Sequence, residues 1–541
     1  MPTYLLSYLT GSLLFAASLS AQQAQAQAPT KQWEKSFGGS ERDNARVVRA
    51  TRDGGVIVGG ISFSSPGSGT RTQANRGLGD YWIHKLDAQG NTQWERAVGG
   101  IYADDLYSLE QTPDGGYLLA GDSGSPVGGD KTQGVIGEID YWFVKLDANG
   151  NKLWDKVIGG NRADFLHLLS GTRDGGYIVG GNSVSDRGFD KSEANKGDYD
   201  YWIVKLDATG NRQWDRTLGT SLSEAIGGLQ QTSDGGYLVG GDGRHGRDGD
   251  KTQVGRGNSD MWVVKLSATG TTLWDKTYGT TGSEQLTSMW ATPDGGALLG
   301  GSSTAGINGD KTQVSRGSYD CWLVKIDANG IKQWDRAYGG PGSEAIFDIY
   351  PTPDGGYILG CGTDSGIGGD KSQAGRGGRD FWIIKIDATG TKQWERTLGT
   401  SGFDFFTSVR PTTTGGYIIA GDSDAGIDGD KISPNYGRDD YWVIMLNGTT
   451  TTTTTAASRS NLSVYPTPAQ GHLTLHLPDE ASHRDLKIRL VDATGRIVYA
   501  QAVKTLGRDV AVEVGAHPAG LYFLRLEGAD GYLATQRVIL E

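Results

Sequence analysis

A repeat of 60 residues runs through most of this 541-residue chain and limits the folds open to it. Each complete unit resembles the stretch 200–219, DYWIVKLDATGNRQWDRTLG, which reads as a strand, a tight turn and a second strand. Two tryptophan columns keep the register: Trp33, Trp94, Trp154, Trp214, Trp274, Trp334 and Trp394, then Trp82, Trp142, Trp202, Trp262, Trp322, Trp382 and Trp442. With a further pair of strands around a DGG or TGG turn, the pattern predicts seven four-stranded units in residues 31–447.

The two ends of the repeat region are complementary. The first copy opens at KQWEKSFGG (31–39) with only the second strand of the hairpin, and the last stops at DYWVIMLNG (440–448) with only the first. We therefore predict an all-β, seven-bladed β-propeller in which the N-terminal strand completes the last blade and closes the ring. A solenoid is the alternative, but it needs atypical capping repeats, and these end repeats are ordinary.

Composition agrees with many short strands joined by turns. The chain has 86 glycines and 36% hydrophobic residues, without the Gly-X-Y period of collagen. The net charge of −12 argues against nucleic acid as a partner, because phosphate binding needs a concentrated basic face. The two cysteines, Cys321 and Cys361, fall in different repeats, and we interpret both as unpaired.

The N-terminal residues 1–26 have the pattern of a secretory signal peptide, an apolar run followed by small residues and glutamines. A membrane anchor is the alternative, but the run is shorter than the ~20 apolar residues that span a bilayer. No other segment is apolar enough to cross one. The sequence thus predicts export, to the cell surface or beyond, and no transmembrane segment in the mature chain.

A carboxylate recurs eight residues before the Thr that precedes each DGG or TGG turn. The column consists of Asp43, Asp104, Asp164, Glu224, Glu284, Glu344 and Asp404. Because it begins the innermost strand, we expect it to ring the mouth of the central channel. It has two interpretations: structural pairing with the equally regular basic residue after each QW[DE] segment, or capping of backbone groups, and binding of cations or basic groups.

Two further columns are candidates for binding. A Gly-Asp-Lys segment recurs in the long loop, with aspartates at 130, 190, 250, 310, 370 and 430; loop-to-loop salt bridges are its first interpretation and a calcium site its second. A column near the end of the innermost strand varies instead: Arg49, Glu110, Ser170, Gln230, Trp290, Tyr350 and Arg410. Trp290 and Tyr350 are neighbours there, which suits carbohydrate stacking, although an accidental aromatic pair is the simpler interpretation.

Catalytic signatures are missing from the sequence. It contains no HxH, HExxH, Gly-x-Ser-x-Gly or phosphate-loop motif, so we predict no metal site, no cofactor and no catalytic residue. Enzymatic activity is the alternative rather than the expectation, because a site assembled from several blades leaves no local motif.

The C-terminal segment has a different character. A threonine-rich tract, 448–460, is interpreted as a linker, and the 60-residue register is lost in 461–541. Tyr465-Pro466-Thr467-Pro468, Asp492-Ala493-Thr494-Gly495-Arg496 and Pro518-Ala519-Gly520-Leu521-Tyr522 resemble the Pro-Asn-Pro, "D..GR" and "PAG(I/L)Y" motifs of type IX secretion system sorting domains. The resemblance departs at Thr467 and at the acidic terminus, Glu541. It implies a small β-sandwich that engages the type IX machinery, directs passage across the outer membrane and is then cleaved.

The repeats carry resemblances of their own. The segment LDATGNRQW (206–214) resembles the tryptophan-docking motif of quinoprotein propellers, in which a Gly turn leads to a Trp that locks adjacent blades. The whole unit resembles long propeller repeats of Bacteroidota surface proteins. We expect a non-enzymatic surface or secreted binding module for a glycan or a protein; the alternatives are a polysaccharide hydrolase or lyase and a structural surface component. Fold alone does not choose among these.

Overall fold

The computed structural model describes residues 28–244, 246–448, 463–465, 469, 471–476, 485–492, 497–504, 509–515, 517–528 and 533–540. The chain divides into two compact units, Met1–Thr450 and Thr451–Glu541, which are considered separately. The expected signal peptide (1–26) and all of the expected linker except Gly448 lie outside the described residues. In the ranges described, no helix has the length and apolarity needed to cross a membrane.

Unit 1 is built from four-stranded antiparallel sheets that follow the repeat. The first complete sheet holds β2 (Asp43–Ala50), β3 (Val56–Ser62), β4 (Asp80–Leu86) and β5 (Thr92–Val98), paired in chain order. The next two are β6 (Asp104–Gln111), β7 (Tyr117–Ser123), β8 (Asp140–Leu146), β9 (Lys152–Ile158), and β10 (Asp164–Gly171), β11 (Tyr177–Ser183), β12 (Asp200–Leu206), β13 (Arg212–Leu218).

Three more sheets repeat this order. They are β14 (Glu224–Gln231), β15 (Tyr237–Arg244), β16 (Ser259–Leu266), β17 (Thr272–Tyr278); β18 (Glu284–Ala291), β19 (Ala297–Ser303), β20 (Asp320–Ile326), β21 (Lys332–Tyr338); and β22 (Glu344–Pro351), β23 (Tyr357–Thr363), β24 (Asp380–Ile386), β25 (Lys392–Leu398). The sheets are the blades of a propeller, in which the first strand of each lies innermost.

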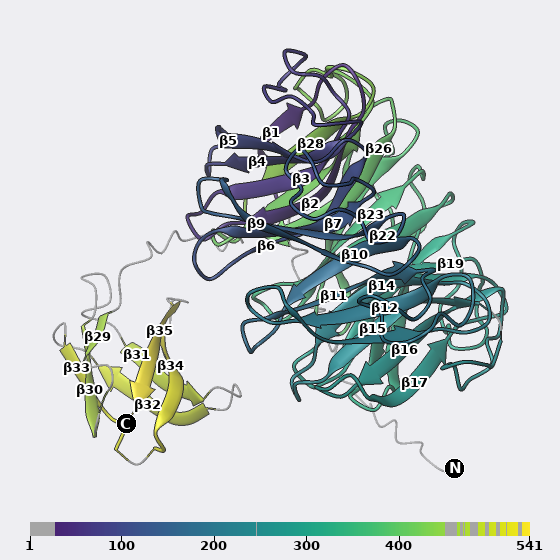
Figure 1. Cartoon of the computed structure of the whole chain (residues 1–541). Helices are drawn as coiled ribbons and strands as arrows, with labels where there is room; N and C mark the ends of the chain where they lie inside the picture. The colour runs from purple at the N-terminus through teal and green to yellow at the C-terminus, as the bar shows by residue number, and fades with distance from the viewer. Residues whose placement is uncertain are drawn as a thin grey trace, which may run out of the picture. The chain divides into compact units, whose positions relative to one another are not determined.

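The seventh sheet joins the two ends of the repeat region. It consists of β26 (Asp404–Pro411), β27 (Tyr417–Ser423) and β28 (Asp440–Leu446), and its outer strand is β1 (Lys31–Phe37). The strands β1 and β28 are antiparallel, with Trp33 opposite Met445 and Phe37 opposite Tyr441, and Figure 1 shows the purple β1 beside the green β28. The predicted closure of the propeller by its N-terminal strand is confirmed.

Neighbouring blades are held together by the YW-type strands, which are buried on both faces. In β4, Tyr81 and Ile83 pack with Leu106 and Trp142 of the next blade in one hydrophobic cluster. The Tyr81 hydroxyl donates a hydrogen bond to the Trp142 carbonyl at 3.1 Å. Tyr441 of the last blade donates to the Trp82 carbonyl of the first at the same distance, so the last junction repeats the first.

The outer tryptophan column docks onto the turn of the next blade. Trp94 donates from Nε1 to the Ala148 carbonyl at 3.2 Å and lies over Gly150, whose φ is 78°. A Cβ at position 150 would lie 3.0 Å from the Trp94 ring, so glycine serves both the left-handed backbone and the close approach. This geometry explains why a Gly turn precedes each QW-type strand.

Every innermost strand contains a β-bulge at the same position. The pairing with the second strand shifts after the third residue of the innermost strand, for example between Leu286 and Ser288, which leaves Thr287 unpaired. The seven bulged residues are Arg46, Tyr107, His167, Gly227, Thr287, Phe347 and Thr407. A bulge turns the side chain away from its regular alternation, which matters for the channel.

Unit 2 is a small β-sandwich. One sheet holds β29 (Ser463–Tyr465), β30 (His472–His476) and β33 (Asp509–Glu513), and the other holds β32 (Ile497–Lys504), β31 (Asp485–Asp492), β34 (Gly520–Gly528) and β35 (Leu533–Leu540). Leu473 and Leu475 of the first share a core with Ile488 and Leu524 of the second. The predicted sandwich is therefore confirmed for the C-terminal segment.

Candidate functional site

The central channel of the propeller contains a cavity of about 490 Å³ that is lined by the innermost strands of all seven sheets. All seven members of the variable column recognised in the sequence line it, including Trp290 and Tyr350. Variation among the repeats agrees with this placement, because packing between blades would hold a column uniform.

The bulged residues form a second variable column in the same cavity, one that the sequence analysis missed. All seven line the channel, and they range from Gly227 to Arg46 and Phe347. A signal was present, because this position differs in most repeats although the residue before it is always apolar. It escaped notice because regular strand alternation does not place positions 347 and 350 on the same face, whereas the bulge does.

Trp290 and Tyr350 form an aromatic pair in the channel. Their ring centroids lie 4.5 Å apart at an angle of 53°, and the guanidinium of Arg410 lies 4.7 Å from the Tyr350 ring centroid. Both rings are half-buried and pack from the channel side against the apolar interior of the blades. An arginine over an aromatic face is a favourable cation–π arrangement, so the three side chains support one another.

Two ion pairs flank the aromatic pair. The Arg49 guanidinium lies 3.9 Å from the Glu110 carboxylate, and Arg410 pairs with Asp348. Asp348 also accepts hydrogen bonds from the Val409 amide at 2.9 Å and the Ser408 hydroxyl at 3.1 Å. Burial, together with the like charge of Arg410, lowers the pKa of Arg49 to about 10, which keeps it protonated at neutral pH.

A second cavity, of about 540 Å³, adjoins the first. Arg46, Phe347 and Thr407 line both, so these side chains separate the two cavities. The second cavity is also lined by Arg379 and Phe405, which the sequence analysis did not single out.

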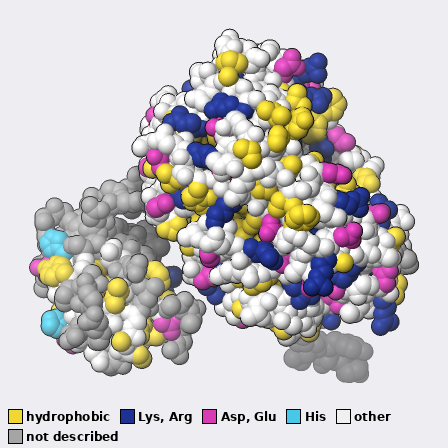
Figure 2. Space-filling model, viewed as in Figure 1, with side chains coloured by type: hydrophobic (Ala, Val, Ile, Leu, Met, Phe, Trp, Pro, Cys, Tyr) yellow, Lys and Arg dark blue, Asp and Glu magenta, His cyan; other side chains and the backbone are white. Residues whose placement is uncertain are grey.

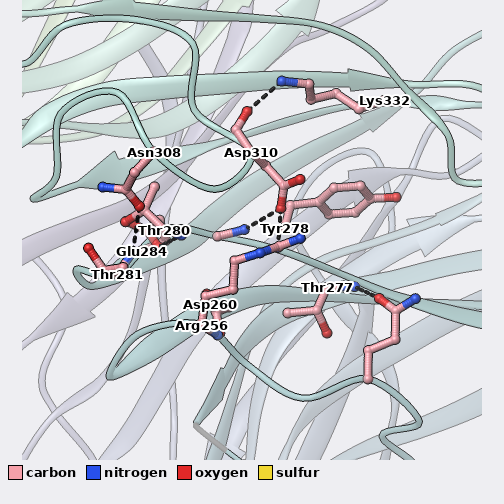
Figure 3. A network of polar contacts seen from close by, with 12 residues as sticks. Arg256, Asp260, Thr277, Tyr278, Thr280, Thr281, Glu284, Asn308, Asp310 and Lys332 are labelled. Atoms are coloured by element: carbon pink, nitrogen blue, oxygen red, sulfur yellow. Dashed lines mark hydrogen bonds and ion pairs between the residues drawn. The ribbon is translucent and has the colours of Figure 1, made fainter.

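The predicted carboxylate column begins the innermost strands, as expected, but it does not ring the channel mouth. All seven side chains, Asp43, Asp104, Asp164, Glu224, Glu284, Glu344 and Asp404, are at most 1% exposed and none lines the channel cavity. Each accepts a hydrogen bond from the backbone amide four residues earlier, as Glu284 does from Thr280 at 2.7 Å (Figure 3). The physical reason is that these carboxylates cap the turn between blades, and capping requires burial.

A second buried column accompanies the first. It consists of Asp80, Asp140, Asp200, Asp260, Asp320, Asp380 and Asp440, each at most 1% exposed. Asp80 accepts from the Arg76 amide at 2.6 Å and approaches Asp104 of the next blade, since a Cβ at Gly99 would lie 2.0 Å from Asp80 Oδ1 and 3.0 Å from Asp104 Oδ2. We call these two columns the carboxylate belt.

Burial raises the pKa of carboxyl groups in the belt. It raises the pKa of Asp80 to about 7 and that of Asp140 to about 6, and the neighbouring carboxylates Asp104 and Asp164 add to the two shifts. At the last junction the pKa of Asp440 rises to about 7 for the same two reasons, with Asp43 as the neighbour. Several members of the belt therefore share protons near neutral pH.

The regular basic residues pair with backbone carbonyls rather than with the belt. Arg96 donates from Nε to the Gly150 carbonyl at 2.9 Å, and Lys156 donates to the Thr209 carbonyl at 2.8 Å, each in the turn of the next blade. The Gly-Asp-Lys aspartates bridge loops: Asp130 pairs with Arg76 at 3.0 Å. Asp310 pairs with Arg256 in the same way in Figure 3. Loop-to-loop salt bridging, the first interpretation of this motif, describes these contacts.

The remaining chemistry-bearing residues form no site of their own. Within the described ranges, no group of three or more His, Cys, Asp or Glu side chains is arranged to hold a metal ion. Cys321 on β20 and Cys361 on β23 are buried, free thiols on different sheets. The visible surface in Figure 2 intersperses basic and acidic side chains rather than gathering one sign into a large patch.

Comparison with known proteins identifies the C-terminal unit. Residues 463–541 match the family described as "Secretion system C-terminal sorting domain". No curated protein matches the chain.

Among solved structures, the WD40 domain of Neurospora crassa Pan2 is 14% identical, with a TM-score of 0.32, and the alignment covers 59% of this chain and 86% of that one. A DUF4221 family member from Bacteroides vulgatus is 9% identical, with a TM-score of 0.35, over 78% and 98%. A puromycin hydrolase mutant is 12% identical, with a TM-score of 0.43, over 81% and 60%. These likenesses are distant, and the propeller architecture rests on the strand topology given above.

The class of protein follows from the two units. A β-propeller is joined to a sorting domain, and such a domain marks its carrier for export through the type IX secretion system to the cell surface or the medium. The motif-based assignment of the C-terminal segment is confirmed. Of its motifs, Pro466–Pro468 and 493–496 lie outside the described residues, whereas Tyr522 is described and donates a hydrogen bond to the Pro518 carbonyl at 2.9 Å.

Proposed function

We propose that the exported propeller is a non-enzymatic saccharide-binding module whose site is the central channel. The observation that supports this most directly is the pairing of Trp290 with Tyr350, centroid to centroid at 4.5 Å, in a cavity of about 490 Å³. Half-buried aromatic faces offer a large apolar surface to the C–H faces of a sugar ring. Ligand cavities commonly measure roughly 300–1,000 Å³, and this one lies in that range.

Polar groups around the aromatic pair suit sugar hydroxyls. Gln230 lies one blade before Trp290 in the same column and Ser170 one blade before that, and both line the cavity. An amide and a hydroxyl each both donate and accept hydrogen bonds, which matches the dual character of a sugar hydroxyl. Apolar faces with a few convergent polar groups are the usual composition of a small-molecule site.

The carboxylates of the channel favour binding over hydrolysis. Glycoside hydrolysis uses two carboxyl groups, one protonated to act as the acid and one ionised. Glu110 lies beside Arg49, and Asp348 is engaged by Arg410, Ser408 and the Val409 amide. Both carboxylates are engaged by arginines, so neither is free to serve a leaving group as its general acid.

A glycan array probed with the full exported chain tests the proposal. We expect Trp290→Ala and Tyr350→Ala each to weaken the saccharide signal at least about tenfold, a loss of about 1.4 kcal/mol. Because both rings also pack against the blades, melting curves verify that each variant is folded at the assay temperature. Tyr102→Ala is the matched control, because Tyr102 is 53% exposed and lines no part of the channel. Undiminished binding by both channel variants would overturn the proposal, and release of reducing ends would replace it with the hydrolase or lyase alternative.

A further inference from the structure

The second cavity contains a guanidinium in an unusual setting. The Arg379 Cζ lies 5.3 Å from the Phe347 ring centroid and 6.0 Å from that of Phe405, so two aromatic rings flank one cation. Phe347 and Phe405 are 36% and 45% exposed, which is high for phenylalanine side chains. Phe403 continues the aromatic surface, with its ring stacked at 6.3 Å on Phe405.

A glycine makes room for this arginine. A Cβ at Gly362 would lie 2.7 Å from the Arg379 Nε and 3.2 Å from its Cζ, so any side chain there would displace the guanidinium. The equivalent positions of the other blades all carry side chains: Ile61, Asp122, Asn182, Asp242, Ser302 and Asp422. The arginine and the glycine beneath it therefore occur together in one blade, as expected of a site rather than of a packing repeat.

Arg379 has no counter-charge, although its neighbours have theirs. Arg42 pairs with Asp439 at 3.3 Å and Arg46 pairs with Asp105 at 3.0 Å. Among the described residues, no carboxylate forms an ion pair with Arg379 and no acceptor receives a hydrogen bond from its guanidinium. The cavity thus holds one uncompensated positive charge, whereas the chain as a whole carries −12.

The neighbouring Asp422 does not cancel that charge. It lines the same cavity, and burial raises its pKa to about 8, so the protonated, neutral form prevails at neutral pH. Its carboxyl group accepts hydrogen bonds from the Ala45 amide and, at 3.1 Å, from the Asn44 side chain, both in the next blade.

We propose that this cavity receives the carboxylate of an acidic saccharide, a uronic acid residue, on the guanidinium of Arg379. The inference rests on the proposed function and adds to it the chemical class of the ligand. Guanidinium binds carboxylate through two parallel N–H···O bonds, and the flanking rings reduce competition from water. Phe347 and Tyr350 are three residues apart on β22, about 10 Å at the usual rise per residue, so neighbouring sugars of one chain reach both sites.

Titration calorimetry of the full chain with two matched probes tests the inference. The probes are tetragalacturonate and its fully methyl-esterified form, which keep the same sugar chain but differ in the charge and the methyl groups of the carboxyl positions. We expect the wild type to bind the acidic form at least about tenfold more tightly. Arg379→Gln is expected to bring the acidic form down to the level of the ester without changing ester binding.

Two further variants separate the charge from the fold. Gly362→Ala displaces Arg379 without removing it and should reduce acidic binding in the same direction as Arg379→Gln. Arg256→Gln is the matched control, because Arg256 pairs with Asp310 in a loop and lines neither cavity, and it should change acidic binding less than about twofold. Melting curves of each variant verify that the propeller is intact.

The outcomes distinguish the two proposals. If Arg379→Gln lowers binding of both probes equally, or if the wild type does not prefer the acidic probe, the inference is wrong while saccharide binding stands. If Trp290→Ala leaves binding of every saccharide intact, the proposed function itself fails. Tighter binding of a short peptide through its terminal carboxylate, lost in Arg379→Gln, would also overturn the inference and assign the cavity to a protein partner.

Discussion

The innermost strands carry both the first column of the carboxylate belt and the channel wall, yet that column is acidic in all seven repeats whereas the wall differs from repeat to repeat. In the belt every blade carries a buried acid that caps the turn before its innermost strand, Glu284 and Asp104 alike. In the channel the same strands present a tryptophan, a tyrosine, arginines and even a glycine. Uniform positions are those on which blade-to-blade packing depends, whereas positions free of packing are open to selection by a ligand.

Removal of strand β1, which pairs with β28 and closes the propeller, is expected to have the largest effect, because it weakens the packing of the whole ring. Deletion of residues 31–39 exposes the edge of β28 and removes Glu34, the acceptor of the Trp442 indole N–H. Loss of this buried packing costs about 3–5 kcal/mol or more, so the chain should melt well below the wild type or aggregate, as calorimetry and light scattering would record.

The control for that deletion is Gln32→Lys, which changes an exposed residue of the same strand and should leave the melting temperature unaltered. A truncated chain that stays monomeric and melts with the wild type would mean that the outer strand contributes nothing to the ring.

A single belt substitution should also be costly. Asp104→Ala leaves the Gly100 amide, now 2.6 Å from the carboxylate, buried without an acceptor, at a cost of about 1–3 kcal/mol. Ser170→Ala, a change in the channel wall, should cost less than about 0.5 kcal/mol. Urea titration of both variants measures the two free energies of unfolding. Equal costs at the two sites would contradict the division of the innermost strand into packing and binding positions.

The belt should give the protein an acid-shifted stability optimum. Carboxyl groups whose folded pKa is raised, such as Asp80 and Asp440 at about 7, stabilise the fold below their unfolded pKa near 4, and this contribution is lost as pH rises through about 7. The turn carboxylates Asp114 and Asp234 act in the opposite direction. Hydrogen bonds from the Thr hydroxyl and the Lys ammonium at each turn lower their pKa to about 2, so their contribution to stability is lost as the pH falls below about 4.

Thermal melts from pH 3 to pH 9 should therefore peak between about 4 and 6 and decline by several degrees toward pH 8. Asp80→Asn should flatten the alkaline side, because its amide cannot ionise, while Gln230→Asn in the channel should leave the profile unchanged. A stability that rises steadily from pH 5 to pH 8 would show that the belt is not protonated in the folded protein.

The smallest effect is expected for Glu110→Gln, which frees Arg49 in the channel. Their separation of 3.9 Å and partial exposure make this pair worth less than about 1 kcal/mol of stability. Removing the negative charge should strengthen binding of tetragalacturonate about two- to fivefold without a measurable change in melting temperature. Weaker binding instead would show that Glu110 contacts the saccharide directly.

The sequence determined the architecture because the architecture is local and repeated. The features that predict it each act within one or two blades, so their structural consequence could be predicted from the sequence. They are the DGG hairpin turns, the strand alternation in YWIVKLD and the half hairpins at 31–39 and 440–448. The sorting domain could likewise be recognised from the sequence, since its motifs are short and follow one another in order along the chain. The role of tryptophans such as Trp82 and Trp94 in packing and docking followed from the same periodicity.

Which polar columns face the channel could be read only from the three-dimensional arrangement of the strands. Periodicity placed Asp104 and Tyr350 on the innermost strand but not on a given side of it, because a one-residue bulge reverses the alternation and brings Phe347 into the channel. The setting of Arg379 depends on Gly362 and Phe405, which lie in separate strands and meet only where blades pack. Contacts between distant segments leave no period in the sequence, and so the fold and the variable column could be predicted, whereas the bulged column and the setting of Arg379 could not.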